Sequence, residues 1–288
     1  MLKKLELPYE LHAELVKYCD TKKIRFLSTA FDHQSLDFLV SELGLATLKI
    51  SSGDITNAPL LLSHARSGKD VILSTGMSTL GEIEDALGVL AFGYLESTKS
   101  PSCAMFKEAY CSVKGKQLLH EKVTLLHCTT EYPAPLEDIN LNAMATLSCA
   151  FGLKTGYSDH SKGIVIPVAA AALGACVIEK HFTLDREMNG PDHRASLEPD
   201  ELKEMVTSIR AVEKAMGSHH KGPQPSELGN LSIARKSLIA TRSIKIGEEF
   251  TVNNIGVKRP GNGRNPMKYW DVLGDISDRA YEIDEVIK

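Results

Sequence analysis

Two histidines have the residue type and the position of metal ligands. His160 and His181 each follow a short apolar run, and about one βα unit separates them along the chain. Neutral imidazole is a common ligand of divalent transition metals, and a catalytic metal keeps positions open for substrate. Alternate residues of a strand share a face, so Ser158 lies on the side of His160, and Glu179 lies on the side of His181. The pair fits a divalent metal site, although two hydrogen-bonded histidines near strand ends would give the same pattern.

A lysine and several hydroxyls form a second group of candidate residues. Lys49 lies in the run Thr47–Ser51, which Ser52 follows, and Ser74 and Thr75 end the next run. This set suits a phosphate dianion, because lysine supplies a compact charge and hydroxyls donate hydrogen bonds. Burying a lysine without an anion is costly, which favours a binding role. The alternative is a lysine that reaches solvent past the strand end. The chain has no GxGxxG or GxxxxGK[ST] phosphate loop.

The elements that must position these groups alternate between short apolar strands and amphipathic helices. The predicted strands are Ile24–Ser28, Thr47–Ser51, Val71–Ser74, Val123–Cys128, Lys154–Ser158 and Cys176–Phe182. Strands that alternate with helices pair in parallel and give an α/β fold. Every one of these strands ends in polar side chains, whereas an open doubly wound sheet concentrates its site at one switch point. A barrel gathers all its strand ends at one mouth, so we predict a TIM-type (β/α) barrel.

The helical segments show clear start and stop signals. Thr79 and Glu82 form a capping box, and a second periodic segment runs from Pro199 to Gly217. The first visible element is a helix near Pro8–Cys19, with no strand before it. Six strands would leave two unpaired edges and an open lumen where a closed barrel has eight strands. We therefore expect that the chain lacks the first two βα units of the barrel.

Composition shifts along the chain predict two domains. Residues 1–216 form the partial barrel, with an inserted surface segment at 96–121 that carries at most one short helix. Residues 217–230 are a linker rich in Gly, Pro and Ser, and residues 231–288 are a small, mostly β module. Two short strands are predicted in this module: Ser237–Arg242 and Gly256–Lys258. A module this small needs a partner surface to complete its core.

The composition excludes several classes of protein. The chain has 33 Lys and Arg against 37 Asp and Glu, a net charge of −4, and therefore no broad basic field for nucleic acid. No apolar run reaches the ~18 residues of a membrane span, and the chain shows no signal peptide. The 6 cysteines are scattered without a CxxC pair, as in reduced cytosolic proteins. We predict a cytoplasmic globular protein that binds neither nucleic acid nor membrane.

Short motifs that occur in order along the chain carry a resemblance to a known family. They are Phe26-Leu-Ser-Thr-Ala-Phe31, Lys49-Ile-Ser-Ser-Gly-Asp54, Ile72-Leu-Ser-Thr-Gly-Met77, Leu126-His-Cys-Thr-Thr-Glu-Tyr-Pro133, Gly156-Tyr-Ser-Asp-His160, Glu179-Lys-His-Phe-Thr183 and Gly190-Pro-Asp192. Together they resemble the N-acetylneuraminate (sialic acid) synthase family. The segment Val257-Lys-Arg-Pro-Gly-Asn-Gly263 resembles the C-terminal antifreeze-like (SAF) module of that family. The resemblance covers essentially the whole chain apart from 96–121.

The resemblance implies a reaction and a metal. A TIM barrel would condense phosphoenolpyruvate with the open-chain aldehyde of an N-acetylated amino sugar of the N-acetylmannosamine type. The products would be a nine-carbon 2-keto acid, as in sialic acid biosynthesis, and phosphate. His160 and His181 would hold a divalent metal that polarises the aldehyde, with manganese as first choice and magnesium or cobalt as alternatives.

The resemblance also assigns roles to further residues. Lys49 and Asp54 match catalytic positions. The positions that hold phosphoenolpyruvate, besides Lys49, are Ser52, Ser74, Thr130 and Ser158. The positions that line the phosphoenolpyruvate or sugar site are Thr29, Tyr132 and Asp192. Arg259, from the SAF module, would reach the sugar in the partner subunit of a domain-swapped homodimer.

Two departures from the family pattern leave other interpretations open. Asp54 stands where the family often has glutamate, which shortens its reach. The family's first two barrel strands carry an acidic residue and a lysine–glutamine pair, and neither strand is found here. We therefore expect an N-terminally truncated chain that is inactive and poorly folded alone. The alternatives are a legionaminate, pseudaminate or 9-phosphate-forming synthase, and an inactive fragment that acts only in binding or assembly.

Overall fold

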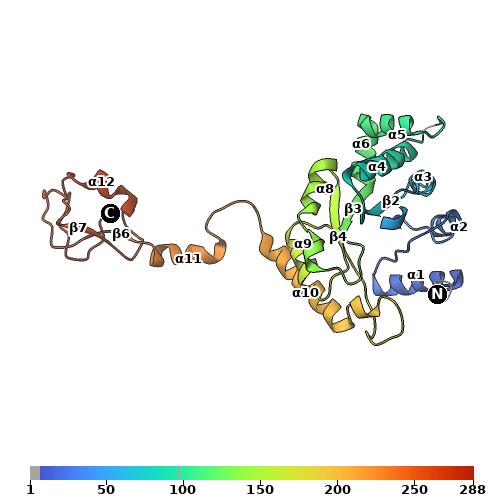
Figure 1. The fold of residues 1–288 in the computed structure, drawn as a ribbon. Helices are drawn as coiled ribbons and strands as arrows, with labels where there is room; N and C mark the ends of the chain where they lie inside the picture. The colour runs from blue at the N-terminus through green and yellow to red at the C-terminus, as the bar shows by residue number, and fades with distance from the viewer. Residues whose placement is uncertain (1–6, 97) are drawn as a thin grey trace. The chain divides into compact units, whose positions relative to one another are not determined.

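The computed structural model describes residues 7–96 and 98–288. The chain divides into two units, the first ending at Gly217 and the second beginning at Ser218 (Figure 1). Among the described residues, no helix is both long enough and apolar enough to cross a membrane.

The first unit is built on one parallel sheet. Its strands are β1 (Thr47–Ile50), β2 (Asp70–Ser74), β3 (Val123–Cys128), β4 (Lys154–Asp159) and β5 (Ile178–Lys180). They pair in the order β1-β2-β3-β4-β5, each strand beside the one that precedes it in the chain. The predicted α/β class and parallel pairing are therefore confirmed.

The sheet curls. Strands lie roughly 4.8 Å apart, so the outer strands of a flat five-stranded sheet would be roughly 19 Å apart. Yet the Lys49 Nζ on β1 lies 3.6 Å from the Glu179 Oε2 on β5, a contact that their side chains could not make across a flat sheet. A parallel sheet that curls in this way is consistent with part of a TIM-type barrel.

The prediction of a strand at Ile24–Ser28 is wrong. No strand or bridge is described within this segment, and the residue after it, Thr29, makes a single parallel bridge to Lys49. Ile24 is 63% exposed and Leu27 is 38% exposed, so burial does not stabilise an extended conformation here. The described part of the chain thus contains five strands of the six predicted.

Helices flank the sheet, some packed on its strands and others on neighbouring helices (Figure 1). They are α1 (Tyr9–Lys22), α2 (His33–Asp37), α3 (Ala58–Arg66), α4 (Leu80–Tyr94), α5 (Cys103–Cys111), α6 (Val113–Lys122), α7 (Leu136–Ile139), α8 (Ala143–Phe151), α9 (Val165–Ala172) and α10 (Pro199–Met216). Shorter helical turns are η2 (Phe38–Glu42), η3 (Ser52–Asp54) and η4 (His193–Ala195). The predicted capping box begins α4: the Glu82 amide donates to the Thr79 hydroxyl at 3.3 Å, and the Thr79 amide donates to the Glu82 carboxylate at 2.8 Å.

Strand alternation separates the core from the site. Ile50, Leu73 and Leu125 are almost fully buried and pack in one cluster with Leu87 of α4. Lys49, next to Ile50 in β1, points to the opposite face because successive side chains of a strand alternate. The apolar helices therefore stabilise one face of the sheet, and the polar groups line the other.

The segment 96–121 forms two helices, where we predict at most one. Ser102 accepts a hydrogen bond from the Met105 amide and starts α5, and Ser112 accepts one from the Gly115 amide and starts α6. Both helices pack on α4. Two serine caps in sequence divide a segment whose apolar pattern is too weak to show either helix.

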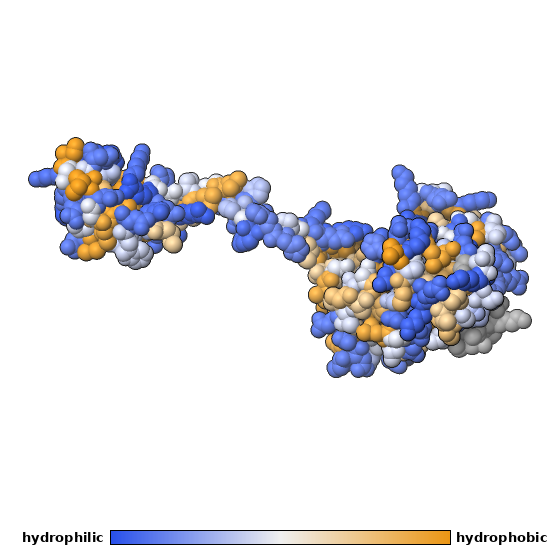
Figure 2. Space-filling view, turned by 90° about the horizontal axis from the view of Figure 1, so that it is seen from above, coloured by the Kyte–Doolittle hydropathy of each residue, from blue (hydrophilic) through white to orange (hydrophobic). Residues whose placement is uncertain are grey.

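The second unit has a small core of its own. Its elements are α11 (Pro225–Ala234), β6 (Ser237–Ala240), β7 (Ile255–Lys258), η5 (Pro266–Lys268) and α12 (Tyr269–Val272). The strands β6 and β7 pair antiparallel around a buried apolar cluster. Apolar residues are also exposed on this unit, including Ile246 and Met267, and Figure 2 shows apolar surface in orange. The helix α11 begins inside the predicted linker, because Gln224 and Glu227 form a capping box.

Candidate functional site

A chain of polar contacts crosses the inner face of the sheet. Lys49 Nζ donates to the Ser74 Oγ at 2.7 Å and lies 3.6 Å from the Glu179 carboxylate. The Ser158 hydroxyl donates to the other Glu179 oxygen at 2.6 Å. Lys49, Ser74 and Ser158 are buried, with exposed fractions of 6%, 3% and 2%, whereas the Glu179 side chain is 40% exposed. The contact chain brings together β1, β2, β4 and β5 near their carboxyl ends.

The two histidines face each other beside these polar contacts. The ring centroids of His160 and His181 are 5.4 Å apart. His160 Nδ1 lies 2.6 Å from the Thr129 carbonyl oxygen, which can only accept, so Nδ1 carries the proton and Nε2 keeps its lone pair. Burial lowers the pKa of His160, which favours the neutral ring. A neutral imidazole with a free Nε2 is the form that binds metal.

Tyr132 and Asp192 complete the surroundings of the histidines. The Tyr132 ring centroid is 4.2 Å from that of His160 and 5.3 Å from that of His181. Burial raises the pKa of Tyr132, so its hydroxyl stays protonated. The Asp192 Oδ2 lies 3.9 Å from the His181 Nδ1. Within residues 7–96 and 98–288, no group of three or more His, Cys, Asp or Glu side chains is arranged to hold a metal.

A second polar group lies at the ends of β1, β2 and β3. The Gly76 amide donates to the Ser52 Oγ at 3.0 Å, and this oxygen lies 3.2 Å from the Cys128 Sγ. A Cβ on Gly76 would stand 2.4 Å from the Thr130 Oγ1 and 2.9 Å from the Ser52 Oγ. Only glycine therefore lets these hydroxyls approach the backbone at this point.

Two other predicted residues lie near β1 in the fold: Thr29 and Asp54. Thr29 bridges to the backbone of Lys49. Asp54 lies in η3, where its carboxylate accepts from the Ser51 hydroxyl at 2.8 Å and from the Asn57 amide at 3.3 Å. The carboxylate of Asp54 is thus held by its own loop.

Arg259 belongs to the second unit. Its guanidinium Nε donates to the Ala234 carbonyl oxygen at 3.0 Å, and its side chain is exposed. Its role in a partner subunit stays a prediction.

Two residues of the site have no predicted role. Glu179 bonds Ser158 and pairs with Lys49, yet strand alternation alone places it only on the face of His181. The close approach at Gly76 is equally invisible in a single sequence. Both depend on contacts between strands that are distant along the chain.

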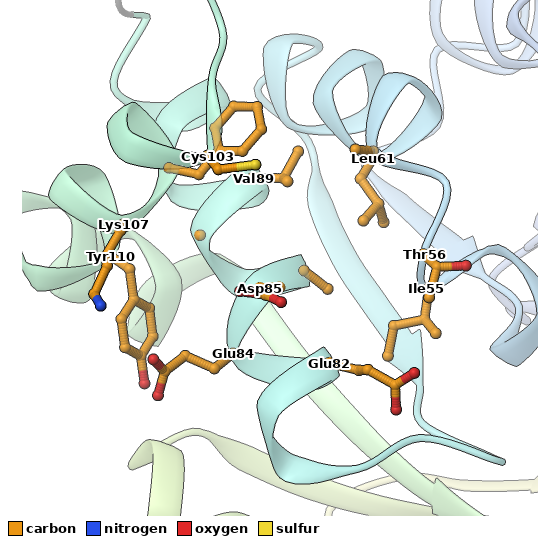
Figure 3. Close-up of a pocket in the computed structure, with 14 residues that line it drawn as sticks. Ile55, Thr56, Leu61, Glu82, Glu84, Asp85, Val89, Cys103, Lys107 and Tyr110 are labelled. Carbon is orange, nitrogen blue, oxygen red and sulfur yellow. The ribbon is translucent and has the colours of Figure 1, made fainter.

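The cavities of the first unit differ in their relation to this site. A cavity of about 460 Å³ lies among α3, α4 and α5 (Figure 3). Figure 3 shows Lys107 and Tyr110 on one side of α4, and Ile55 and Leu61 on the other. None of the predicted site residues lines this 460 Å³ cavity. A cavity of about 600 Å³ is lined by Cys128 and Thr130 and therefore adjoins the strand ends.

Comparisons with known proteins agree with this arrangement. The NeuB family model matches residues 1–221. The chain is 50% identical over 288 residues to the N,N'-diacetyllegionaminic acid synthase of Campylobacter jejuni, covering 100% of this chain and 79% of that protein. It is 35% identical over 285 residues to the human N-acetylneuraminate-9-phosphate synthase, covering 98% of this chain and 72% of that protein.

A solved structure is similar as well. The crystal structure of the N-acetylneuraminic acid (sialic acid) synthetase of Leptospira borgpetersenii, in complex with citrate, matches with a TM-score of 0.65 and 37% identity. The match covers 79% of this chain and 70% of that chain. The resemblance to the sialic acid synthase family is therefore confirmed, and the chain belongs to the NeuB family.

Proposed function

We propose that this protein condenses phosphoenolpyruvate with an N-acetylated amino sugar to give a 2-keto sugar acid and phosphate. The observation that carries the proposal is that contacts join the group around Lys49 to the pair of histidines. Ser158 donates to Glu179, which pairs with Lys49, and the same hydroxyl lies 3.5 Å from the His160 Nε2. A buried cation and a pair of imidazoles thus border one region at the strand ends. The relatives in the family are synthases of nine-carbon sugar acids, which supports the same reaction class.

The Lys49 side of the site suits phosphoenolpyruvate. Its ammonium is buried, and Ser74 holds it in place. A buried ammonium is stabilised when an anion binds next to it, and the phosphate ester carries two negative charges. Ser52 and Thr130, close to the Gly76 amide, supply further hydrogen-bond donors. We assign the binding of the ester to these groups.

The histidine side of the site fits a divalent metal. His160 presents a free Nε2, since its Nδ1 donates to the Thr129 carbonyl, and His181 faces it. His160 and His181 would hold the ion, with manganese as first choice and magnesium or cobalt as alternatives. When bound, the ion would supply the Lewis acid that polarises the sugar aldehyde. Two protein ligands leave positions open for substrate.

The remaining residues would orient the reactants. The enol carbon of phosphoenolpyruvate forms the new bond to the aldehyde carbon, water adds to the ester carbon, and phosphate leaves with cleavage of its C–O bond. The Tyr132 ring lies next to both histidines, and its protonated hydroxyl would donate a hydrogen bond to the sugar. Glu179 accepts from Ser158 and pairs with Lys49, so it holds both groups in position for the ester. We also propose a catalytic role for Asp54, which would act through a water molecule bound beside its loop.

Two unphosphorylated sugars are the leading candidates for the acceptor. N-Acetylmannosamine is the acceptor that follows from the motifs. Greater identity to the legionaminic acid synthase, 50% against 35% for the 9-phosphate-forming enzyme, favours the diacetamido sugar that gives N,N'-diacetyllegionaminic acid on gaining three carbons. The SAF role of the second unit, with Arg259 reaching the sugar of a partner subunit, is part of the same proposal.

An assay with three acceptors tests the proposal. The protein is incubated with Mn²⁺, phosphoenolpyruvate and either N-acetylmannosamine, its 6-phosphate or the diacetamido sugar. Phosphate release and product mass are measured for the 288-residue chain and for a version extended upstream of Met1. We expect a 2-keto acid from one acceptor in at least one version, and loss of the product in His160→Ala. No 2-keto acid from any acceptor in either version would contradict the proposed reaction.

A further inference from the structure

A buried ion pair lies directly behind the two histidines. Asp159 and Lys180 are paired in register on β4 and β5, and Lys180 Nζ donates to the Asp159 Oδ2 at 2.6 Å. The two side chains are 0% and 2% exposed. Asp159 precedes His160, and Lys180 precedes His181, so strand alternation directs this pair to the face opposite the site.

The Lys180 ammonium holds the chain on both sides of His160. Besides the Asp159 carboxylate, it donates to the carbonyl oxygen of Ser161. The other carboxylate oxygen of Asp159 accepts from the Ser161 amide at 2.9 Å. The residue before His181 is therefore bonded to both neighbours of His160. The position of one imidazole is coupled to that of the other through these bonds.

Stability alone does not explain this pair. Removing two charges from water costs as much as their attraction returns, so a well-packed neutral pair would be about as stable. Other backbone bonds hold each histidine separately: the His181 carbonyl accepts from the Leu197 amide at 2.9 Å, and the His160 carbonyl accepts from the Ala134 amide at 2.9 Å. Between the two histidines, β5 is a strand of three residues that pairs in the sheet with β4 alone among the described strands. Metal ligation tolerates little error, because ligand nitrogens lie within a few tenths of an ångström of their ideal distance. An anchor at this point controls the spacing of the two rings.

We propose that Asp159 and Lys180 are positioning residues that set the distance and orientation of His160 and His181 for one divalent cation. The proposal rests on the metal site of the proposed function. It predicts that the pair matters more for metal affinity than for stability. Outer groups that orient a metal ligand typically contribute 10- to 100-fold to metal affinity.

The test removes the pair without leaving a single buried charge. The variant Asp159→Asn/Lys180→Met is compared with wild type and with Ile83→Val, a core change in α4 away from β4 and β5. Each protein is stripped with EDTA. Mn²⁺ affinity is measured by calorimetry, the Co²⁺ complex by visible absorption, and the melting temperature without metal by circular dichroism.

The expected results separate positioning from folding. The double variant should melt within a few degrees of wild type, bind Mn²⁺ roughly 10- to 100-fold more weakly and show an altered Co²⁺ spectrum. Ile83→Val should melt lower and keep wild-type Mn²⁺ affinity and Co²⁺ spectrum. Mn²⁺ affinity of the double variant within twofold of wild type overturns the positioning role while leaving the metal site intact. Absence of Mn²⁺ binding in wild type overturns the metal site and, with it, the role of the pair.

Discussion

Replacing Lys49 with methionine removes the buried ammonium and keeps a side chain of similar length. A hydrogen bond to a charged group contributes about 1.5–3 kcal/mol, so the affinity for phosphoenolpyruvate should fall roughly 10- to 150-fold. The change also leaves Glu179 without the cation 3.6 Å away. Because the Glu179 side chain is 40% exposed, solvent screens that loss, and stability should fall by only about 1 kcal/mol. The effect on binding therefore exceeds the effect on folding.

Calorimetric titration with phosphoenolpyruvate in the presence of Mn²⁺ measures the effect, and thermal melts follow stability. The control is Lys122→Met, which makes the same chemical change at the amino end of the strands, where Lys122 lies 3.9 Å from Asp70. The control should bind phosphoenolpyruvate as wild type does. Affinity of Lys49→Met within twofold of wild type would refute the assignment of this ammonium to the ester.

Three further predictions concern the metal, the phosphate-side backbone and the pH dependence of stability. Mn²⁺ should raise the melting temperature of wild type by ligand linkage, and His160→Ala should abolish the increase; an equal increase in both proteins would contradict ligation by His160. Gly76→Ala should weaken phosphoenolpyruvate binding at least tenfold, because its Cβ would meet Thr130 at 2.4 Å, whereas Gly229→Ala, with open space around its Cβ, should bind normally in the same titration. Burial lowers the pKa of His64, so the unfolded chain takes up protons first as the pH falls below about 6.5; stability should be fully present above that pH and fall below it, and melts of His64→Leu should show a smaller loss between pH 7 and pH 5.

Local signals in the sequence predict much of the first unit. The capping box at Thr79 depends on residues three positions apart, and the structure begins α4 there. The alternation places Ser158 with His160 on one side of β4, and Glu179 with His181 on one side of β5, and their contacts show that both pairs lie on the inner face of the sheet. These features follow from the geometry of a single helix or strand, so they are readable from the chain alone.

Features that depend on distant partners are not predictable in the same way. The run Ile24–Ser28 has strand-forming residues, but a strand needs a ladder of hydrogen bonds, and here one bridge forms at Thr29. The predicted strand Cys176–Phe182 shortens to Ile178–Lys180 because β4 pairs with only that part. Pairing is a property of the neighbour as much as of the segment.

The role of Glu179 illustrates the limit most clearly. Its contact with Lys49 exists only because the sheet curls until β5 meets β1. The residues of β1 and β5 alone do not predict how strongly the sheet curls. Likewise, the sequence gives no sign that Lys180 is buried, whereas the structure pairs it with Asp159 in the interior. The curl of the sheet therefore creates the Lys49–Glu179 contact of the site, and the pairing of β4 with β5 creates the anchor behind it.

Pulsed electron paramagnetic resonance of Mn²⁺ bound together with phosphoenolpyruvate tests the shared site most directly. We predict couplings to nitrogen nuclei of two histidine imidazoles, and a coupling to the phosphorus of the ester in the same complex. The nitrogen couplings should diminish in His160→Ala and in His181→Ala. A Mn²⁺ spectrum without imidazole nitrogen coupling, or without the phosphorus coupling when the ester is saturating, would contradict a common site for the two.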